Sequence, residues 1–363
     1  MKIAYEEEEP GIVQYKIPLR WNWQFADNPF VNEKDGTLPI WIAIKGDEIA
    51  GQMCAMPMRM KIGDHTYDGG WGCDFIVLKK FRGEGIGWLL NKAYCDYFQV
   101  VVHITYANST KKIWEKLESI PVSPVSIMWN IVKLNNNFVF RYLNYRTESR
   151  PSLNRLITIL CKYFFLHYFI AFCGNTLTAI ANPIRMLSRK NTKAEITEIN
   201  EFDEDFAAFI DTASTGYDSL VKREPQFLRW KYIGNPMMQY HLFVLRKNED
   251  IKGYVVLRKP HPAELNIGII ADIFAARGDE ESVEALVSHA IAFFGKSVNV
   301  IQVLVSLDFI VKILQKHGFI TIKTSEPHFV CSDPALREKL KEHTKEWFVT
   351  YADHDQDQIV PIK

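Results

Sequence analysis

Residues 77–90 read Val-Leu-Lys-Lys-Phe-Arg-Gly-Glu-Gly-Ile-Gly-Trp-Leu-Leu, a strand end followed by a glycine-rich turn and an apolar helical pattern. A turn that contains Gly83, Gly85 and Gly87 lets the backbone approach an anion closely. The first N–H groups of the following helix have no partner within the helix and carry the positive end of its dipole. Arg82 adds a full positive charge beside them. The stretch therefore predicts a phosphate-binding turn.

Two other glycine motifs fit this stretch poorly. A P-loop requires Gly-Lys-Ser/Thr after its second spaced glycine, whereas this chain has Gly87-Trp88. A dinucleotide-binding fold requires Gly-x-Gly-x-x-Gly, and the spacing here is Gly-x-Gly-x-Gly. A turn that only connects a strand to a helix is the structural alternative.

The whole string resembles the coenzyme A motif of the GNAT family of N-acetyltransferases, Arg/Gln-x-x-Gly-x-Gly/Ala. Arg82, Gly85 and Gly87 fall on its fixed positions. The resemblance implies acetyl-CoA as the cosubstrate, with its pantetheine arm along the strand end and its pyrophosphate on the turn. Asn108 and Trp114, further along the chain, also match positions that contact the cofactor in this family. The cofactor-binding residues implied are Ile76, Val77, Arg82, Gly83, Glu84, Gly85, Ile86, Gly87, Asn108 and Trp114.

The chain departs from the family at Trp114. Residues 100–108 read as a strand that ends in Asn108, and residues 109–117 read as a short helix, which is the order found in the family. That helix in the family carries a tyrosine that often protonates the departing thiolate. An indole N–H does not donate a proton at ordinary pH, so another group protonates the thiolate or the chemistry is impaired.

Acetyl transfer needs a neutral amine, a polarised thioester carbonyl and a protonated thiolate. In this family two central strands splay to admit the thioester, and a backbone N–H near Val77 would polarise its carbonyl. The candidate catalytic residues are Asp74 on the same strand, and His103 and Tyr106 on the next one. Each has a structural alternative: Asp74 as a backbone-bonding residue, His103 as a core histidine and Tyr106 as a packing residue.

A weak internal repeat runs through the chain. Leu19-Arg20-Trp21 precedes Asn28-Pro29, as Leu228-Arg229-Trp230 precedes Asn235-Pro236. Three further pairs of segments follow in the same order, which indicates two tandem copies of one fold. These pairs are residues 41–51 with 243–253, residues 74–77 with 272–275, and residues 114–117 with 314–319.

The fold class expected is α/β of the α+β kind, with two tandem GNAT folds that each have a mixed, mostly antiparallel sheet flanked by helices. The expected boundaries are residues 1–147 for the acyl-CoA domain, 148–192 for an apolar helical linker and 193–363 for a second GNAT-like domain. Its turn reads Arg277-Gly278-Asp279-Glu280-Glu281, and three acids there would repel a pyrophosphate. Mycothiol synthase and the Eis-like acetyltransferases show a similar division. The Leu-Arg-Trp and Asn-Pro signature resembles GNAT proteins of bacterial polysaccharide gene clusters.

Composition limits the partners and the compartment. The chain has 363 residues, 47% of them hydrophobic, and 43 basic residues balance 43 acidic ones, so no net field favours nucleic acid. Its 6 cysteines are scattered, which indicates a reducing compartment and no metal site. The start of the chain is acidic and has no apolar signal region. We therefore expect a cytoplasmic protein.

Residues Leu156 to Cys173 form an apolar stretch that approaches the length of a membrane span but is interrupted by Lys162 and His167. Arg155, Thr158 and Lys162 make a narrow polar stripe at helical spacing. This pattern favours a helix packed between domains, and contact with a bilayer surface is the alternative.

The sequence as a whole predicts an N-acyltransferase that moves acetyl from acetyl-CoA to a primary amine, on an amino sugar or another small metabolite. A non-catalytic acyl-CoA sensor or scaffold is one alternative, favoured by Trp114. An aminoacyl transferase of the peptidoglycan-bridge type also has two GNAT copies. That class usually lacks the glycine turn and has a basic face, so the neutral charge argues against it.

Overall fold

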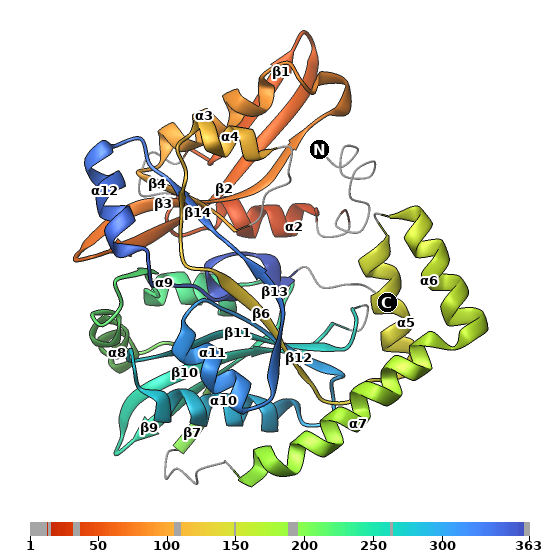
Figure 1. Cartoon of the computed structure of the whole chain (residues 1–363). Helices are drawn as coiled ribbons and strands as arrows, with labels where there is room; N and C mark the ends of the chain where they lie inside the picture. Colours follow the sequence, from red (N-terminus) through yellow and green to blue (C-terminus); the bar gives the residue numbers. More distant parts are fainter. Residues whose placement is uncertain are drawn as a thin grey trace. The chain divides into compact units, whose positions relative to one another are not determined.

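The structure is a computed structural model that describes residues 13, 16–31, 37–104, 110–148, 150–187, 195–261 and 264–358. The chain divides into two compact units, and each unit is built from separate stretches of sequence (Figure 1). Unit 1 takes its residues from 1–125, 201–237 and 324–354, and unit 2 takes its residues from 126–200, 238–323 and 355–363.

Unit 1 contains a mixed sheet with the strand order β15-β8-β2-β3-β4-β14-β5, and β1 pairs with β2 beside that path. The contacts β3–β4 and β8–β15 are parallel, and the others are antiparallel. The strands are β1 (Ile40–Lys45), β2 (Glu48–Ile62), β3 (His65–Val77), β4 (Val100–His103), β5 (Ile120–Pro121), β8 (Ser219–Val221), β14 (His328–Val330) and β15 (Trp347–Phe348).

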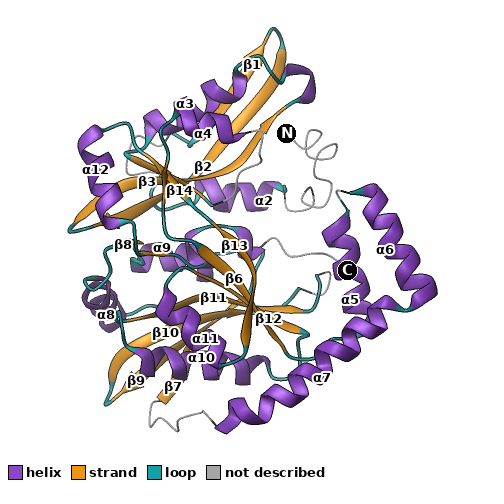
Figure 2. Ribbon diagram, viewed as in Figure 1, coloured by secondary structure: helices purple, strands orange, loops and turns teal. Residues whose placement is uncertain are grey.

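Helix α3 (Ile86–Tyr97) covers one face of this sheet together with α4 (Lys111–Lys116) (Figure 2). Leu90, Tyr94 and Cys95 form the buried face of α3, at the spacing expected of an amphipathic helix. Beside them, a Cβ atom at Gly70 would lie 2.4 Å from the Phe98 ring, so only glycine lets this ring reach the strand.

Unit 2 contains a second mixed sheet with the order β13-β6-β12-β11-β10-β9-β7. Its parallel contact is β11–β12, and α10 (Glu280–Phe294) and α11 (Asp308–Lys316) accompany the sheet (Figure 1). The strands are β6 (Val125–Ile131), β7 (Glu195–Ile199), β9 (Tyr240–Lys247), β10 (Asp250–Arg258), β11 (Ile267–Ala275), β12 (Val300–Val305) and β13 (Phe319–Ser325). Two mostly antiparallel sheets flanked by helices confirm the expected fold class.

The two sheets repeat the same local packing. Gly51 lies opposite Val77 in unit 1, as Gly253 lies opposite Ala275 in unit 2. An added Cβ atom would lie 2.8 Å from the carbonyl oxygen of the neighbouring strand at both glycines. The strand–turn–strand pairs predicted from the repeat are therefore equivalent elements.

The two copies exchange one strand. The chain runs from β5 into β6, yet β6 lies between β12 and β13 in the sheet of unit 2. It likewise runs from β13 into β14, which lies between β4 and β5 in the sheet of unit 1. The predicted contiguous segments 1–147, 148–192 and 193–363 differ from this division because each sheet needs a strand from the other half of the sequence.

The Asn-Pro repeat is also present, with a shift in register. α2 (Pro18–Trp21) continues into the π-helical turn η2 (Asn22–Ala26), as α9 (Pro225–Leu228) continues into η5 (Arg229–Ile233). The rings of Trp23 and Trp230 stack with centroids 4.7 Å apart, and each indole N–H donates to the carbonyl of the other residue. Trp23, and not Trp21, is therefore the counterpart of Trp230, because the two Asn-Pro pairs share this spacing.

The apolar stretch from Leu156 to Cys173 is not one helix. α6 (Pro151–Phe164) ends at Phe164, the next residue, Phe165, has φ of 53°, and α7 (Leu166–Leu187) begins after it at an angle of 80°. Both helices lie beside α5 (Asn136–Thr147) (Figure 1). Phe164, Phe169 and Phe172 are each more than 60% exposed, so the prediction of a buried interdomain helix is wrong for this stretch.

Candidate functional site

The parallel strands β3 and β4 of unit 1 pair only over three residues, Gly69–Trp71 with Val100–Val102. Beyond Trp71, β3 bends at a bulge where Asp74 and Phe75 are inserted opposite Met53, and Asp74 has φ of 50°. A bulge bends its strand and takes a residue out of the ladder. The last six residues of β3 thus leave β4 just before the glycine-rich turn.

The turn after β3 has the geometry of an anion-binding loop. Gly83 and Gly85 have φ values of 88° and 85°, which strain any residue with a side chain. A Cβ atom at either position would meet no atom within 4 Å, so these glycines face open space. Gly85 is the N-cap of α3, and no side chain caps this helix. Its first-turn N–H groups therefore point out of the fold without a side-chain acceptor.

The other turn residues support the loop from the side. Arg82 donates from Nε to the carbonyl oxygen of Val77 at 2.9 Å, which ties the turn to the end of β3. Glu84 accepts from Lys45 Nζ at 2.5 Å on the surface. A Cβ atom at Gly87 would lie 3.4 Å from Ile113 and Phe75, which is an ordinary contact distance.

The equivalent helix of the second copy is closed by its own sequence. Gly278 has φ of 82°, like Gly85, but the next residue, Asp279, caps α10. The carboxylate of Asp279 accepts from Ser282 N at 3.1 Å and from Ser282 Oγ at 2.6 Å. Glu280 and Glu281 follow in the first turn. A carboxylate therefore holds the place that an anion would take.

Asp74 lies in a buried ion pair. Its carboxylate contacts Lys16 Nζ, and both side chains are less than 10% exposed. Gln52 donates from Nε2 to the carbonyl oxygen of Asp74 at 3.0 Å, which fixes the bulge. An acceptor amine that reached Asp74 would share this carboxylate with the Lys16 ammonium.

The sequence pattern predicts neither Lys16 and Gln52 as neighbours of Asp74 nor the bulge itself. Lys16 is 58 residues from Asp74 in the chain and belongs to no motif. The bulge has a weak signal only, because aspartate adopts positive φ more readily than most residues.

His103 packs in the core on the α3 side of the sheet. Its ring lies 4.0 Å from the Trp114 ring, and its Nε2 is buried without a hydrogen-bond partner among the described residues. Desolvation, with a smaller contribution from His328, lowers the pKa of His103 to about 3. A histidine with so low a pKa is a weak base, which favours the structural alternative.

The remaining predicted residues lie in different places. Ile76 and Val77 end β3 and Ile86 begins α3, so the structure brings them to the turn. Trp114 is buried beneath α3 and is 3% exposed. Tyr106 and Asn108 lie outside the described residues, so their placement stays a prediction.

A surface cleft of about 240 Å³ lies at the other end of the unit 1 sheet. It reaches β3 at Asp68 and Gly69, which precede the bulge at Asp74 by several residues. The cleft is therefore separate from the glycine-rich turn. Its lining also includes Phe30, Val31, Thr37, Pro57, Met58, Arg59, Tyr97 and Phe98.

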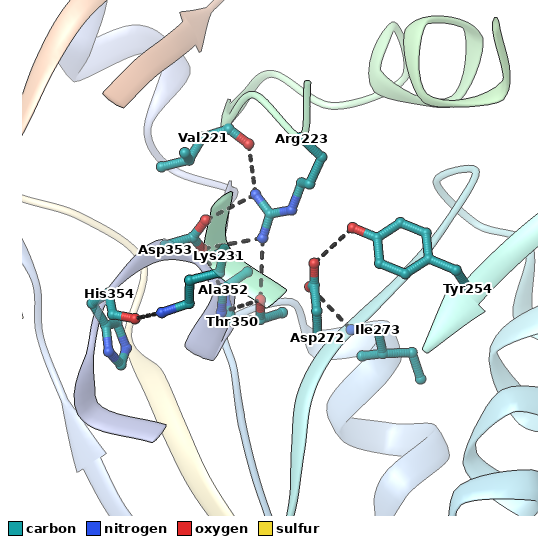
Figure 3. A network of polar contacts seen from close by, with 10 residues as sticks. All are labelled: Val221, Arg223, Lys231, Tyr254, Asp272, Ile273, Thr350, Ala352, Asp353 and His354. Carbon is teal, nitrogen blue, oxygen red and sulfur yellow. Dashed lines mark hydrogen bonds and ion pairs between the residues drawn. The ribbon is translucent and has the colours of Figure 1, made fainter. Parts of the chain in front are cut away.

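A buried polar network holds the C-terminal segment of unit 1 (Figure 3). Arg223 pairs with Asp353 at 2.9 Å, donates to the Val221 carbonyl at 2.6 Å and reaches Thr350 Oγ1 at 3.1 Å. Lys231 donates to the carbonyl oxygen of His354. These contacts fix residues 350–354 against the segment that follows β8, and they are structural.

In unit 2, Asp272 corresponds to Asp74 in the repeat, but it pairs with Val256 in the ladder, and the bulge falls one residue earlier, at Ala271. Figure 3 also draws its contacts: Tyr254 donates its hydroxyl to Asp272 Oδ2 at 2.6 Å, and Ile273 N donates to Oδ1 at 3.0 Å. The carboxylate is fully buried. The second copy thus repeats the aspartate but encloses it.

Comparison with known proteins gives a likeness of structure alone. No family model matches the sequence, and no curated protein matches it. A GCN5-related N-acetyltransferase from Anabaena variabilis superposes with a TM-score of 0.51 over 80% of this chain and 62% of its own, at 9% identity. One from Kribbella flavida has a TM-score of 0.49 over 80% of this chain and 59% of its own, at 11% identity. Eis1 from Mycobacterium abscessus has a TM-score of 0.45 over 81% of this chain and 64% of its own, at 13% identity.

This chain thus spans about three fifths of the length of those proteins. The likeness to the Anabaena protein covers four fifths of the chain, and the central strands of the two sheets share one order and one parallel pair. The chain therefore has the fold of the GCN5-related N-acetyltransferases, in two copies that exchange a strand.

Proposed function

We propose that this protein is an N-acyltransferase that moves acetyl from acetyl-CoA to the primary amine of a small acceptor, with the cosubstrate bound by unit 1. The observation that carries the proposal is the contrast between the two copies. In unit 1, two positive-φ glycines precede a helix without a side-chain cap, whereas Asp279 closes the same helix end in unit 2. Uncapped N–H groups at a helix start attract a phosphate.

The chemistry follows from the strands around this turn. The acceptor nitrogen attacks the thioester carbonyl, the N–C bond forms and the C–S bond breaks, and coenzyme A leaves as a thiolate that must gain a proton. Asp74 is the nearest carboxylate on the splayed part of β3 and is the base that we propose. Pantetheine along Ile76 and Val77 would bring the thioester beside it. Amino sugars are one acceptor class with such an amine.

Calorimetric titration with acetyl-CoA and with free coenzyme A tests the site. We expect Gly85→Glu to weaken binding of both by at least about tenfold, because a carboxylate would enter the anion-binding turn. Gly278→Glu is the matched control, since Gly278 has the same φ and equally open surroundings. Equal affinity of the Gly85→Glu variant and the parent protein would reject the assignment.

A non-catalytic acyl-CoA sensor is the second candidate, and one observation favours it. Trp114 is buried against His103 at the position where the family resemblance implies a proton donor. A thiol-release assay over a panel of amines, run with protein that binds acetyl-CoA, separates the two. Turnover of any amine supports the enzyme, whereas binding without release of coenzyme A supports the sensor.

A further inference from the structure

The junction of α6 and α7 exposes a dense group of aromatic side chains, here called the aromatic elbow. Phe164 is 71% exposed, Phe172 is 70% exposed and Phe169 is 66% exposed, values unusual for phenylalanine. The chain bends by 80° at Phe165, which has a positive φ. The members of the elbow are Tyr163, Phe164, Phe165, Tyr168, Phe169 and Phe172.

The helix α6 is amphipathic with its apolar face turned outward. Two of its polar side chains pack inward on α5: Asn154 donates to Thr147 Oγ1 at 2.9 Å, and Thr158 donates to Asn144 Oδ1 at 3.3 Å. Arg155 and Lys162 are exposed. Leu153, Leu156 and Ile159 follow at helical spacing on the exposed side. An ordinary surface helix of a globular protein has the opposite orientation.

The start of α7 shows the same inversion. Asn175 exchanges two hydrogen bonds of 2.8 Å with the backbone of Leu134. Gly174 lies so near Leu134 that a Cβ atom would be 2.6 Å from its side chain. The polar and small residues thus anchor α7 to unit 2, and the large rings face away from it.

The charge around the elbow is one-sided. No aspartate or glutamate occurs between Glu148 and Glu195, although the chain as a whole has a net charge of zero. In the sequence, lysine and arginine residues precede and follow the aromatic residues, and Lys162 directly precedes Tyr163. In sequence they are Arg150, Arg155, Lys162, Arg185, Arg189, Lys190 and Lys193.

We propose that the aromatic elbow docks on the surface of an anionic lipid bilayer, with α6 and the first half of α7 lying in the interface. Aromatic rings favour the boundary between headgroups and acyl chains, and basic residues attract anionic lipids. In the described part of the chain, no single helix is long and apolar enough to cross a membrane. Only α6 and Leu166–Thr176 taken together have the length and apolar composition of a membrane span, and they are bent by 80° where they meet.

Flotation of the full chain with two kinds of vesicle tests the proposal. We expect the protein to float with vesicles of phosphatidylcholine and phosphatidylglycerol and to stay at the bottom with phosphatidylcholine alone. The triple variant Phe164→Ser, Phe169→Ser, Phe172→Ser should lose at least about tenfold in partitioning. The pair Arg155→Gln, Lys162→Gln should weaken binding and remove much of its salt dependence.

The matched control is Ile42→Ser with Ile44→Ser, which removes exposed apolar side chains from β1 in unit 1. It should float like the parent protein, and all variants should show unchanged thermal melting. Failure of the parent protein to float with anionic vesicles overturns the proposal, as does flotation of the triple variant at the parent level. Resistance to alkaline carbonate would indicate a spanning segment instead. If the triple variant dissociates a dimer that does not bind vesicles, the face belongs to a second copy of this chain.

Discussion

At the residue scale, the pair of Asp74 and Lys16 determines how the proposed base works. Asp74 lies on a bulge that Gln52 fixes through its backbone carbonyl, so replacing its carboxylate leaves the strand path intact. The ion pair with Lys16 also holds the carboxylate in place, and both side chains are less than 10% exposed. Activity and cofactor binding should therefore separate at this position.

We expect Asp74→Asn to lower kcat by at least about 100-fold, the usual range for loss of a general base. The dissociation constant of acetyl-CoA should change by less than about twofold, because the phosphate-binding turn is unaffected. Steady-state kinetics and calorimetry on one preparation measure both. A parallel loss of turnover and binding would give Asp74 a structural role.

His103 links the stability of unit 1 to pH. The pKa of His103 is lowered from an ordinary value of 6.5 to about 3 in the folded protein. Below pH 6.5 the unfolded chain therefore binds a proton at this residue that the folded protein does not bind. Stability should fall by roughly 2 kcal/mol between pH 6.5 and pH 5 from this group alone. Urea unfolding at these two pH values measures the loss. In His103→Leu the difference should shrink by that amount, and an unchanged difference would contradict the assignment.

At the scale of elements, the two glycine turns differ in the N-cap of the helix that follows: no side chain caps α3, whereas Asp279 caps α10. We expect Asp279→Ala to destabilise the protein by about 1 kcal/mol, because α10 loses its N-cap, and Asp279→Ser to restore most of this loss. Chemical denaturation gives both values. Neither variant should gain affinity for acetyl-CoA, since Glu280 and Glu281 remain at the helix start. A new binding site in Asp279→Ala would show that the cap alone blocks this turn.

The elements that the sequence predicts well are those with a local signal. The glycines from Gly83 to Gly87 indicate a turn, because glycine adopts a positive φ without strain, as Gly83 and Gly85 do. The alternation of apolar and polar residues indicates the strand–turn–strand pairs. The break at Phe165 has no such signal, since phenylalanine rarely adopts positive φ. The expected burial of residues 156–173 is also wrong, because an apolar helix has the same pattern whether it faces a core or a bilayer.

At the scale of the whole molecule, the exchange of β6 and β14 could not be read from the sequence. Both strands have the short apolar pattern of any sheet strand, and pairing in the other sheet satisfies it equally well. The Lys16–Asp74 pair could not be predicted for a similar reason, since contacts between residues far apart in the chain leave no periodic pattern in the sequence. The sequence repeat shows that there are two copies of the fold, but it does not show in which of the two sheets β6 and β14 pair.

The exchange predicts that neither half of the chain folds alone. We expect residues 1–200 and 201–363, expressed separately, to be insoluble or unfolded, because each sheet would lack the strand from the other half. Co-expression should give a soluble complex that copurifies through a tag on one half. Circular dichroism and affinity purification provide the measurement. A folded, monomeric 1–200 fragment would contradict the exchange.

The exchanged strand also sets the order in which the protein can be completed during synthesis. The edges of β4 and β5 are paired by β14, which leaves the ribosome 207 residues after Pro121, from residue 121 to residue 328. At about 5–20 residues per second, this interval lasts roughly 10–40 s. The first-made sheet therefore waits with two open edges while the rest of the chain is translated, and open edges invite pairing with other chains. The sheet with the glycine-rich turn is begun first and finished last, so a chaperone that shields nascent strand edges has a defined time in which to act.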